Sequence, residues 1–133
     1  MAKKIQIYTD GASRGNPGPA SAGYTIDGVA YGEALGVQTN NYAEYMAIIL
    51  ALKKAQQLLG KKGAKGAEVE IFMDSQLAVR QLNGEYKIKN EGIIPLFIQV
   101  WNLRSDFAKV TFAHVPREEN KEADAAANMA LDK

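Results

Sequence analysis

Hydrophobic and polar residues alternate along residues 4–10, which is the period of a β-strand. Ile5, Ile7 and Thr9 fall on one face of this strand. The opposite face ends in Asp10, where we expect the strand to stop. An aspartate in this place commonly starts a turn or caps a helix, so alone it carries little functional meaning.

Turn-forming residues fill positions 11–19, and two more strand-like runs follow at 22–26 and 29–35. The runs flank Asp27-Gly28, a dipeptide typical of tight hairpins. This part of the chain predicts three strands in an antiparallel meander. Its glycines resemble a phosphate-binding loop, but they lack the Gly-Lys-Ser/Thr ending and precede a strand instead of a helix.

From residue 40 to residue 59 the pattern becomes helical. Apolar residues recur at steps of three and four, namely Tyr45, Ile48, Ile49, Leu52, Ala55 and Leu59. Thr39, Asn40 and Asn41 precede them as candidate caps, and Gly60 stops the helix.

The rest of the chain predicts a series of shorter elements. They are a flexible basic linker at 61–66, a strand at 68–74 that ends in Asp74, a helix capped by Ser75 and reaching Leu82, a loop at 83–92, a helical region at 93–107, a strand at 109–114 and an alanine-rich helix at 119–131. Strands that come first in succession and are later separated by helices predict an α/β fold. Its mixed sheet continues from the meander into parallel strands through right-handed crossovers.

The composition of the chain limits the number of domains and the kinds of metal site that it can form. The 133 residues, 47% of them hydrophobic, predict a single domain over residues 1–133. No apolar run is long enough to span a membrane, and the first residues lead directly into a strand, so we expect a cytoplasmic protein. Because the chain has no cysteine, a metal ion must be bound by oxygen atoms or by His114, which favours hard cations such as Mg²⁺.

The net charge of +1 argues against a protein that finds nucleic acid through bulk charge alone. Divalent cations held in an acidic pocket would make the protein more attractive to phosphate groups. Charge alone therefore neither indicates nor excludes a nucleic-acid substrate.

Four acidic residues occupy comparable places in the predicted elements. If the strands that end in Asp10 and Asp74 lie parallel and adjacent, the two carboxylates meet where ligands bind in open α/β sheets. Glu44 lies in the first turn of its helix, at the margin of the buried stripe, and Asp124 lies on the packed face of the last helix. A favourable interaction with the helix dipole would also explain an acid at either position, although it does not require the buried side.

Carboxylates that point inward from separate elements repel each other and resist ionisation unless cations join them. Two divalent ions about 4 Å apart can bind a scissile phosphate, activate a water and stabilise the leaving oxygen. These residues alone therefore predict a metal-dependent phosphoryl-transfer site.

Four motifs, in order and in spacing, resemble type 1 ribonuclease H over nearly the whole chain. They are Tyr8–Gly18 (YTDGASRGNPG), Thr39–Glu44 (TNNYAE), Met73–Gln76 (MDSQ) and His114–Asp124 (HVPREENKEAD). The resemblance implies a ribonuclease H-like five-stranded sheet flanked by helices. It also implies a monomer that cleaves the RNA strand of RNA–DNA hybrids endonucleolytically with two Mg²⁺ ions, or with Mn²⁺ in their place, leaving 5′-phosphate and 3′-hydroxyl ends. Asp10, Glu44, Asp74 and Asp124 match the metal ligands of that family.

The resemblance implies further residues around this cluster. The substrate-binding positions that it suggests are Gly11, Asn16, Thr39, Asn40, Asn41, Ser75 and Gln76. Turn and cap roles are the alternative for the asparagines. A family histidine that assists proton transfer or product release matches His114, although this residue also shares a strand face with Val110 and Phe112 and could be structural. The sequence after His114 departs from the pattern of many bacterial members, and Arg117 is expected to share its role.

The loop at 83–92 is short where many members carry a basic protrusion, so the chain resembles the subgroup found in archaea, plants and some bacteria. Some members of that subgroup also cleave double-stranded RNA. Tyr86, Lys87 and Lys89 stay candidates for contact with the substrate backbone. Two alternatives remain, a hybrid-binding module of the same fold without catalysis and another nuclease of the wider superfamily, such as a junction resolvase or a proofreading exonuclease.

Overall fold

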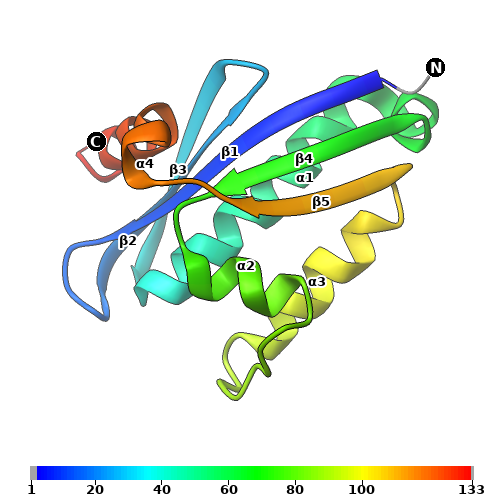
Figure 1. Ribbon diagram of the computed structural model, residues 1–133. Helices are drawn as coiled ribbons and strands as arrows, with labels where there is room; N and C mark the ends of the chain where they lie inside the picture. Colours follow the sequence, from blue (N-terminus) through cyan, green and yellow to red (C-terminus); the bar gives the residue numbers. More distant parts are fainter. Residues whose placement is uncertain (1–2, 133) are drawn as a thin grey trace.

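A single mixed sheet forms the centre of the protein (Figure 1). The structure, a computed structural model, describes residues 3–132. Its elements are β1 (Lys3–Ser13), β2 (Gly18–Ile26), β3 (Val29–Gln38), α1 (Asn40–Lys65), β4 (Ala67–Met73), α2 (Gln76–Leu82), α3 (Ile94–Arg104), β5 (Lys109–His114), a 3-10 turn (Arg117–Glu119) and α4 (Lys121–Leu131). The strand order is β3-β2-β1-β4-β5, with β1 to β3 antiparallel and β4 and β5 parallel to β1. The predicted fold class is confirmed.

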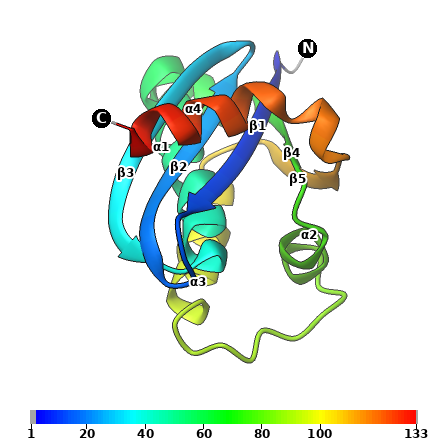
Figure 2. The same ribbon diagram turned by 90° about the vertical axis from the view of Figure 1, so that its left-hand side faces the viewer.

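Helices cover the sheet unequally on its two sides. Helices α1 and α3 lie on one side, whereas α4 alone lies on the other, across β1, β2 and β3 (Figures 1 and 2). The core forms where the apolar stripe of α1 meets β1 and β4, and Ile48, Leu52, Ile7 and Ile71 are fully buried there. Each such side chain contributes about 1.5–3 kcal/mol through burial. Within residues 3–132, no helix combines the length and the hydropathy that crossing a membrane would require.

Two predicted helix caps are confirmed. The hydroxyl of Thr39 accepts a hydrogen bond from the backbone N–H of Tyr42 at 3.1 Å, which begins α1. The hydroxyl of Ser75 accepts from the backbone N–H of Ala78 at 3.2 Å, which begins α2. Each cap satisfies an N–H group that has no partner within the helix itself.

The predicted end of the first strand at Asp10 is wrong. Strand β1 continues to Ser13, because Gly11, Ala12 and Ser13 pair with residues 20–22 of β2. Asp10 therefore lies inside a strand, where its backbone pairs with Gly23 of β2. Turn-forming residues after Asp10 suggested a loop, but pairing with a neighbouring strand overrides their local preference.

The predicted flexible linker at 61–66 is also wrong. Gly60 does interrupt α1, with φ of 76° and ψ of 162°, yet the chain resumes a helical course up to Lys65. Ala64 is fully buried and holds this last part against the core. Tertiary packing here outweighs the poor helix propensity of the glycines.

The region around α4 differs from the single helix predicted at 119–131. A 3-10 turn precedes it, and Asn120 has a non-helical backbone between the turn and α4.

Helix α3 ends at Arg104, before the predicted residue 107. On α3, Trp101 is 55% exposed, stacks on Phe97 and lies under the guanidinium of Arg104.

Helix α4 approaches the sheet at two glycines. A Cβ atom added at Gly23 would lie 2.3 Å from the carbonyl oxygen of Ala123 and 2.3 Å from the nitrogen of Ala127. At Gly32 it would lie 2.5 Å from the carbonyl oxygen of Ala126. Contact between the backbones therefore sets the distance between α4 and the sheet.

We expect Gly23→Ala to lower the free energy of unfolding by about 1–3 kcal/mol, because the added methyl group forces α4 away from β2. Urea denaturation followed by circular dichroism measures this change. Gly63→Ala is the control: its Cβ would lie 3.4 Å from that of Leu59, and alanine suits a helix better than glycine. Equal stability of Gly23→Ala and wild type would contradict the close packing of α4.

Candidate active site

The carboxylates of Asp10 and Asp74 lie at the ends of the pairing between two neighbouring parallel strands, Asp10 within β1 and Asp74 directly after β4. In the register of β1 and β4, Thr9 lies beside Met73 as the last pair; Asp10 is the next residue of β1, and Asp74 directly follows the end of β4. Adjacent strands are about 4.8 Å apart, so the two side chains begin close together. The strand arrangement on which the sequence argument depended is therefore present.

Glu44 reaches this place because α1 begins directly against β1. A Cβ atom at Gly11 would lie 2.3 Å from the backbone nitrogen of Glu44 and 2.4 Å from the carbonyl carbon of Ala43. No side chain fits between the strand and the first turn of the helix. The absence of a side chain at Gly11 thus allows Glu44 to lie next to Asp10.

Asp124 is held by the contact of α4 with β1. The side-chain amide nitrogen of Asn120 donates to the carbonyl oxygen of Thr9 at 2.9 Å, and the backbone N–H of Asp124 donates to the carbonyl oxygen of Asn120 at 3.1 Å. The hydroxyl of Ser21 on β2 adds a bond to the carbonyl oxygen of Ala127 at 2.5 Å. These bonds attach the first turns of α4 to the strands beside Asp10.

Asn120 is a positioning residue that the sequence argument missed. It is 1% exposed and joins the strand that bears Asp10 to the helix that bears Asp124. The sequence pattern placed it inside the helix predicted at 119–131, so nothing there indicated this role; the structure places it directly before α4. In the structure its side chain makes no capping bond to α4.

Asp10 lies at the electrostatic centre of the cluster. Burial is the largest of the causes that raise its pKa to about 8, followed by a hydrogen bond with the carboxyl group of Asp124. Repulsion from Asp74, Asp124 and Glu44 raises it further. The acids predicted from the sequence therefore interact at Asp10, whose carboxyl group retains a proton well above its ordinary range.

Glu44 is influenced by opposing effects. Burial and the charge of Asp74 raise its pKa, whereas a hydrogen bond from the hydroxyl of Ser75 lowers it. Ser75 thus caps α2 and also contacts Glu44, which connects the start of α2 to the carboxylate cluster.

The four carboxylates are the right kind of ligand for a divalent cation, but their side chains are not close enough together to form a complete ligand set. Every donor in the cluster is a carboxylate oxygen, the kind that Mg²⁺ and Mn²⁺ prefer. Among residues 3–132, however, no three acidic or histidine side chains are gathered into a complete ligand set for a metal ion. The mutual repulsion that raises the pKa of Asp10 opposes such gathering without a cation.

His114 and Arg117 lie beside the Asp74 end of the cluster. His114 pairs with Met73 at the end of β5 and is exposed, so it is not a buried structural histidine. The Nε atom of Arg117 is 4.0 Å from Oδ2 of Asp74, and the arginine side chain is 89% exposed. Such a solvated pair is weak, and it leaves Arg117 free to reach another anion.

The predicted substrate-binding residues form two groups around the carboxylates. Asn16, Thr39, Asn40 and Asn41 adjoin the start of α1, where the side-chain oxygen of Asn16 accepts from the backbone N–H of Asn40 at 3.1 Å. Asn41 keeps a buried side-chain oxygen without a hydrogen-bond partner among the described residues. Ser75 and Gln76 begin α2, where Gln76 is exposed. Capping explains Thr39 and Ser75 structurally, but it does not explain Asn41.

Comparisons with known proteins agree with the observed fold. A family described as reverse transcriptase-like matches residues 9–130. The crystal structure of RNase H1 from the halophilic archaeon Halobacterium salinarum is similar with a TM-score of 0.88 and 38% identity, covering 97% of this chain and 98% of that one. The structure of LC11-RNase H1 in complex with an RNA/DNA hybrid is similar with a TM-score of 0.89 and 41% identity, covering 96% of each chain.

A curated protein of Mycobacterium tuberculosis, described as bifunctional, is 38% identical over 97% of this chain. The present chain spans only 36% of its length. The curated ribonuclease HI of Halobacterium salinarum is also 38% identical over 97% of this chain, which spans 65% of that protein.

The raised pKa of Asp10 predicts how stability without metal depends on pH. Between pH about 4 and pH about 8 the folded protein keeps a proton that the unfolded chain has lost, so stability falls as pH rises through this window. Asp10→Asn removes the penalty, and we expect it to exceed wild type by on the order of 3 kcal/mol at pH 8.5 but to match it at pH 4.

Thermal unfolding in EDTA at both pH values measures the difference. Glu91→Gln, which neutralises an exposed carboxylate in the loop before α3, is the control and should change little at either pH. The same shift for Asp10→Asn at pH 4 and pH 8.5 would show that the raised pKa is not the cause.

Proposed function

The chain belongs to the ribonuclease H family, and we propose that it hydrolyses the RNA strand of RNA–DNA hybrids by a two-metal-ion mechanism. One observation carries the proposal: the carboxylates of Glu44 on α1, Asp74 directly after β4 and Asp124 on α4 all interact with the buried Asp10 of β1. A fold that only binds nucleic acid has no need for such a destabilising cluster. Binding divalent cations for phosphoryl transfer would explain why these carboxylates lie together.

We assign the binding of two Mg²⁺ ions, or of Mn²⁺ in their place, to Asp10, Glu44, Asp74 and Asp124. When bound, such ions activate a water and stabilise the leaving 3′-oxygen, which gives 5′-phosphate and 3′-hydroxyl products. The chain itself supplies the strand pairing of β1 around Asp10 and the hydroxyl group of Ser75, whose interaction with Glu44 lowers the pKa of that carboxyl group. Asp10 would give up the proton that it otherwise retains in order to hold a cation.

Arg117 and His114 are the groups that we place next to the departing product. Arg117 approaches Asp74 from solvent, where its guanidinium can contact a phosphate oxygen of the substrate. His114 is exposed at the adjoining end of β5, where it can exchange a proton with solvent. Both positions lie at the side of the cluster that is open to water.

The substrate class follows from the polar residues at the starts of α1 and α2. Asn16, Asn41 and Gln76 offer amide donors and acceptors beside the carboxylates, as the reading of 2′-hydroxyl groups across a shallow minor groove requires. The orphan side-chain oxygen of Asn41 fits a hydroxyl donor from RNA. The similar LC11-RNase H1 was solved in complex with an RNA/DNA hybrid, which supports the same substrate here.

A non-catalytic hybrid-binding module is the second candidate, because the metal-ligand set is not assembled in the described residues. The same fold would then bind the hybrid through the asparagines alone. Catalysis distinguishes the two candidates directly.

We expect an end-labelled RNA–DNA hybrid to be cut in its RNA strand with Mg²⁺ or Mn²⁺, and not with EDTA. Asp74→Asn should lower the rate at least about a thousandfold while leaving the fold intact, because it removes a ligand of the reacting unit. Double-stranded RNA, double-stranded DNA and a DNA junction are run beside the hybrid. Turnover of Asp74→Asn within tenfold of wild type would remove that residue from the mechanism, and binding without cutting would favour the module.

Arg117→Ala should slow single-turnover cleavage by at most about tenfold and leave metal binding unchanged, since an exposed cation contributes modestly. Calorimetric titration with Mn²⁺ measures the metal affinity. Lys62→Ala, which removes an exposed cation at the far end of α1, is the matched control. An unchanged rate in Arg117→Ala would leave Arg117 only a structural role.

A further inference from the structure

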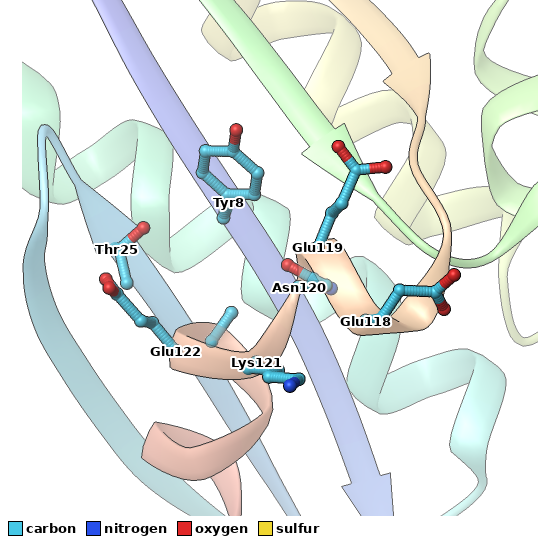
Figure 3. Close-up of a pocket in the computed structure, with 8 residues that line it drawn as sticks. Tyr8, Thr25, Glu118, Glu119, Asn120, Lys121 and Glu122 are labelled. Carbon is cyan, nitrogen blue, oxygen red and sulfur yellow. The ribbon is translucent and has the colours of Figure 1, made fainter.

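A second polar pocket lies beside the start of α4, and none of the four clustered carboxylates lines it. It has a volume of about 320 Å³ and is formed by Tyr8 of β1, Thr25 of β2 and residues 118–123. Figure 3 shows Glu119 and Glu122 extending on opposite sides of Asn120, with the ring of Tyr8 near both.

The side-chain oxygen of Asn120 is the feature that points to a ligand. Asn120 is 1% exposed, and in the described part of the chain this oxygen has no hydrogen-bond partner. The amide cannot be reversed, because its nitrogen donates to the carbonyl oxygen of Thr9 and a reversed amide would oppose two oxygens. Figure 3 shows the oxygen turned toward the side of the pocket where Tyr8, Thr25 and Glu122 lie.

The pocket requires a hydrogen-bond donor with positive charge. Its lining contains three glutamates against one lysine, so negative charge is in excess. The partial positive charge at the start of α4 offsets only part of this excess. An acceptor-only amide oxygen between carboxylates matches an ammonium group, which has donors and no acceptor.

The helix dipole alone does not explain this arrangement. It accounts for acids near the start of α4, as it does in many helices. It does not account for a buried amide oxygen that avoids the free N–H groups of the same helix. An Asn at this position ordinarily uses that oxygen as a cap.

A bare metal ion fits the pocket poorly. In residues 3–132 no three acidic or histidine groups form a ligand set, and the volume far exceeds that of an ion. Between the two flanking carboxylates lies the ring of Tyr8. This surface suits an alkyl chain that carries an ammonium group.

We propose that this pocket binds an aliphatic amine cation, with its ammonium group at Asn120 and Glu122 or Glu119 and its alkyl chain over the ring of Tyr8. A diamine can engage both glutamates at once. The ring of Tyr8, stacked on Phe72 at 5.0 Å between centroids, offers its remaining surface to the cation. The cation comes from a free amine or from a lysine side chain of another protein, and both present the same chemistry.

The test is a titration of the ¹⁵N-labelled protein, followed by NMR, in EDTA and without nucleic acid, so that it does not depend on catalysis. The probes are 1,4-diaminobutane, butylamine and N-acetyl-lysine amide, with sodium chloride at matched ionic strength. We expect saturable shifts of the Asn120 side-chain amide and of the backbone amides of residues 118–123. Saturation by N-acetyl-lysine amide supports a protein lysine as the source, and saturation by the free amines alone supports a small molecule.

Two variants test the assignment of the groups. Glu119→Gln with Glu122→Gln should weaken diaminobutane binding by about tenfold, and Tyr8→Leu by about threefold. Glu68→Gln with Glu70→Gln is the matched control, because it removes two carboxylates from β4, outside the pocket. Shifts that sodium chloride or Mg²⁺ reproduces, or equal weakening in the control, would overturn the proposal.

Discussion

Two helices touch the central strands at positions where no side chain intervenes. At Gly11 the first turn of α1 meets β1, and at Gly23 the middle of α4 meets β2, in each case backbone against backbone. Because glycine has no side chain, a change of rotamer cannot alter the distance between helix and sheet at these positions. Glu44 belongs to α1 and Asp124 to α4, so the same contacts set the distances of their side chains from Asp10.

That geometry works against the stability of the fold. Burial and three neighbouring acids keep the carboxyl group of Asp10 protonated far above its ordinary range, with a pKa of about 8. An apolar residue in the same place would suit the core better, so the acid is retained at a cost in folding free energy. Proteins commonly accept such a cost where a site must bind charged ligands. Hydrogen bonds at Ser75 and Asn120 hold the surrounding elements in place.

The sequence predicted the features that depend on local pattern. Alternation identified β1 and its buried residues, the apolar stripe identified α1, and Thr39 and Ser75 cap the helices that they precede. The parallel register that places Asp10 beside Asp74 followed from the order of the elements.

Features that depend on contacts between distant segments escaped prediction. β1 runs past Asp10 because β2 pairs with it, and residues 61–65 are helical because Ala64 packs in the core. Neither cause is visible in a local pattern. The close packing at Gly23 and the role of Asn120 escaped for the same reason, since a glycine in a strand and an Asn near the start of a helix have commoner explanations. The roles of the residues around the carboxylates rest on resemblance and on the present geometry together.

The position of Trp101 has an optical consequence. It is the single tryptophan of the chain, it lies on α3, and half of its surface already contacts water in the folded protein. Its emission will therefore report mainly on its separation from Phe97 and Arg104, with only a small change in solvation. Events among the carboxylates, on elements other than α3, should leave its fluorescence nearly unaltered, so an intrinsic signal for the site needs a tryptophan introduced elsewhere.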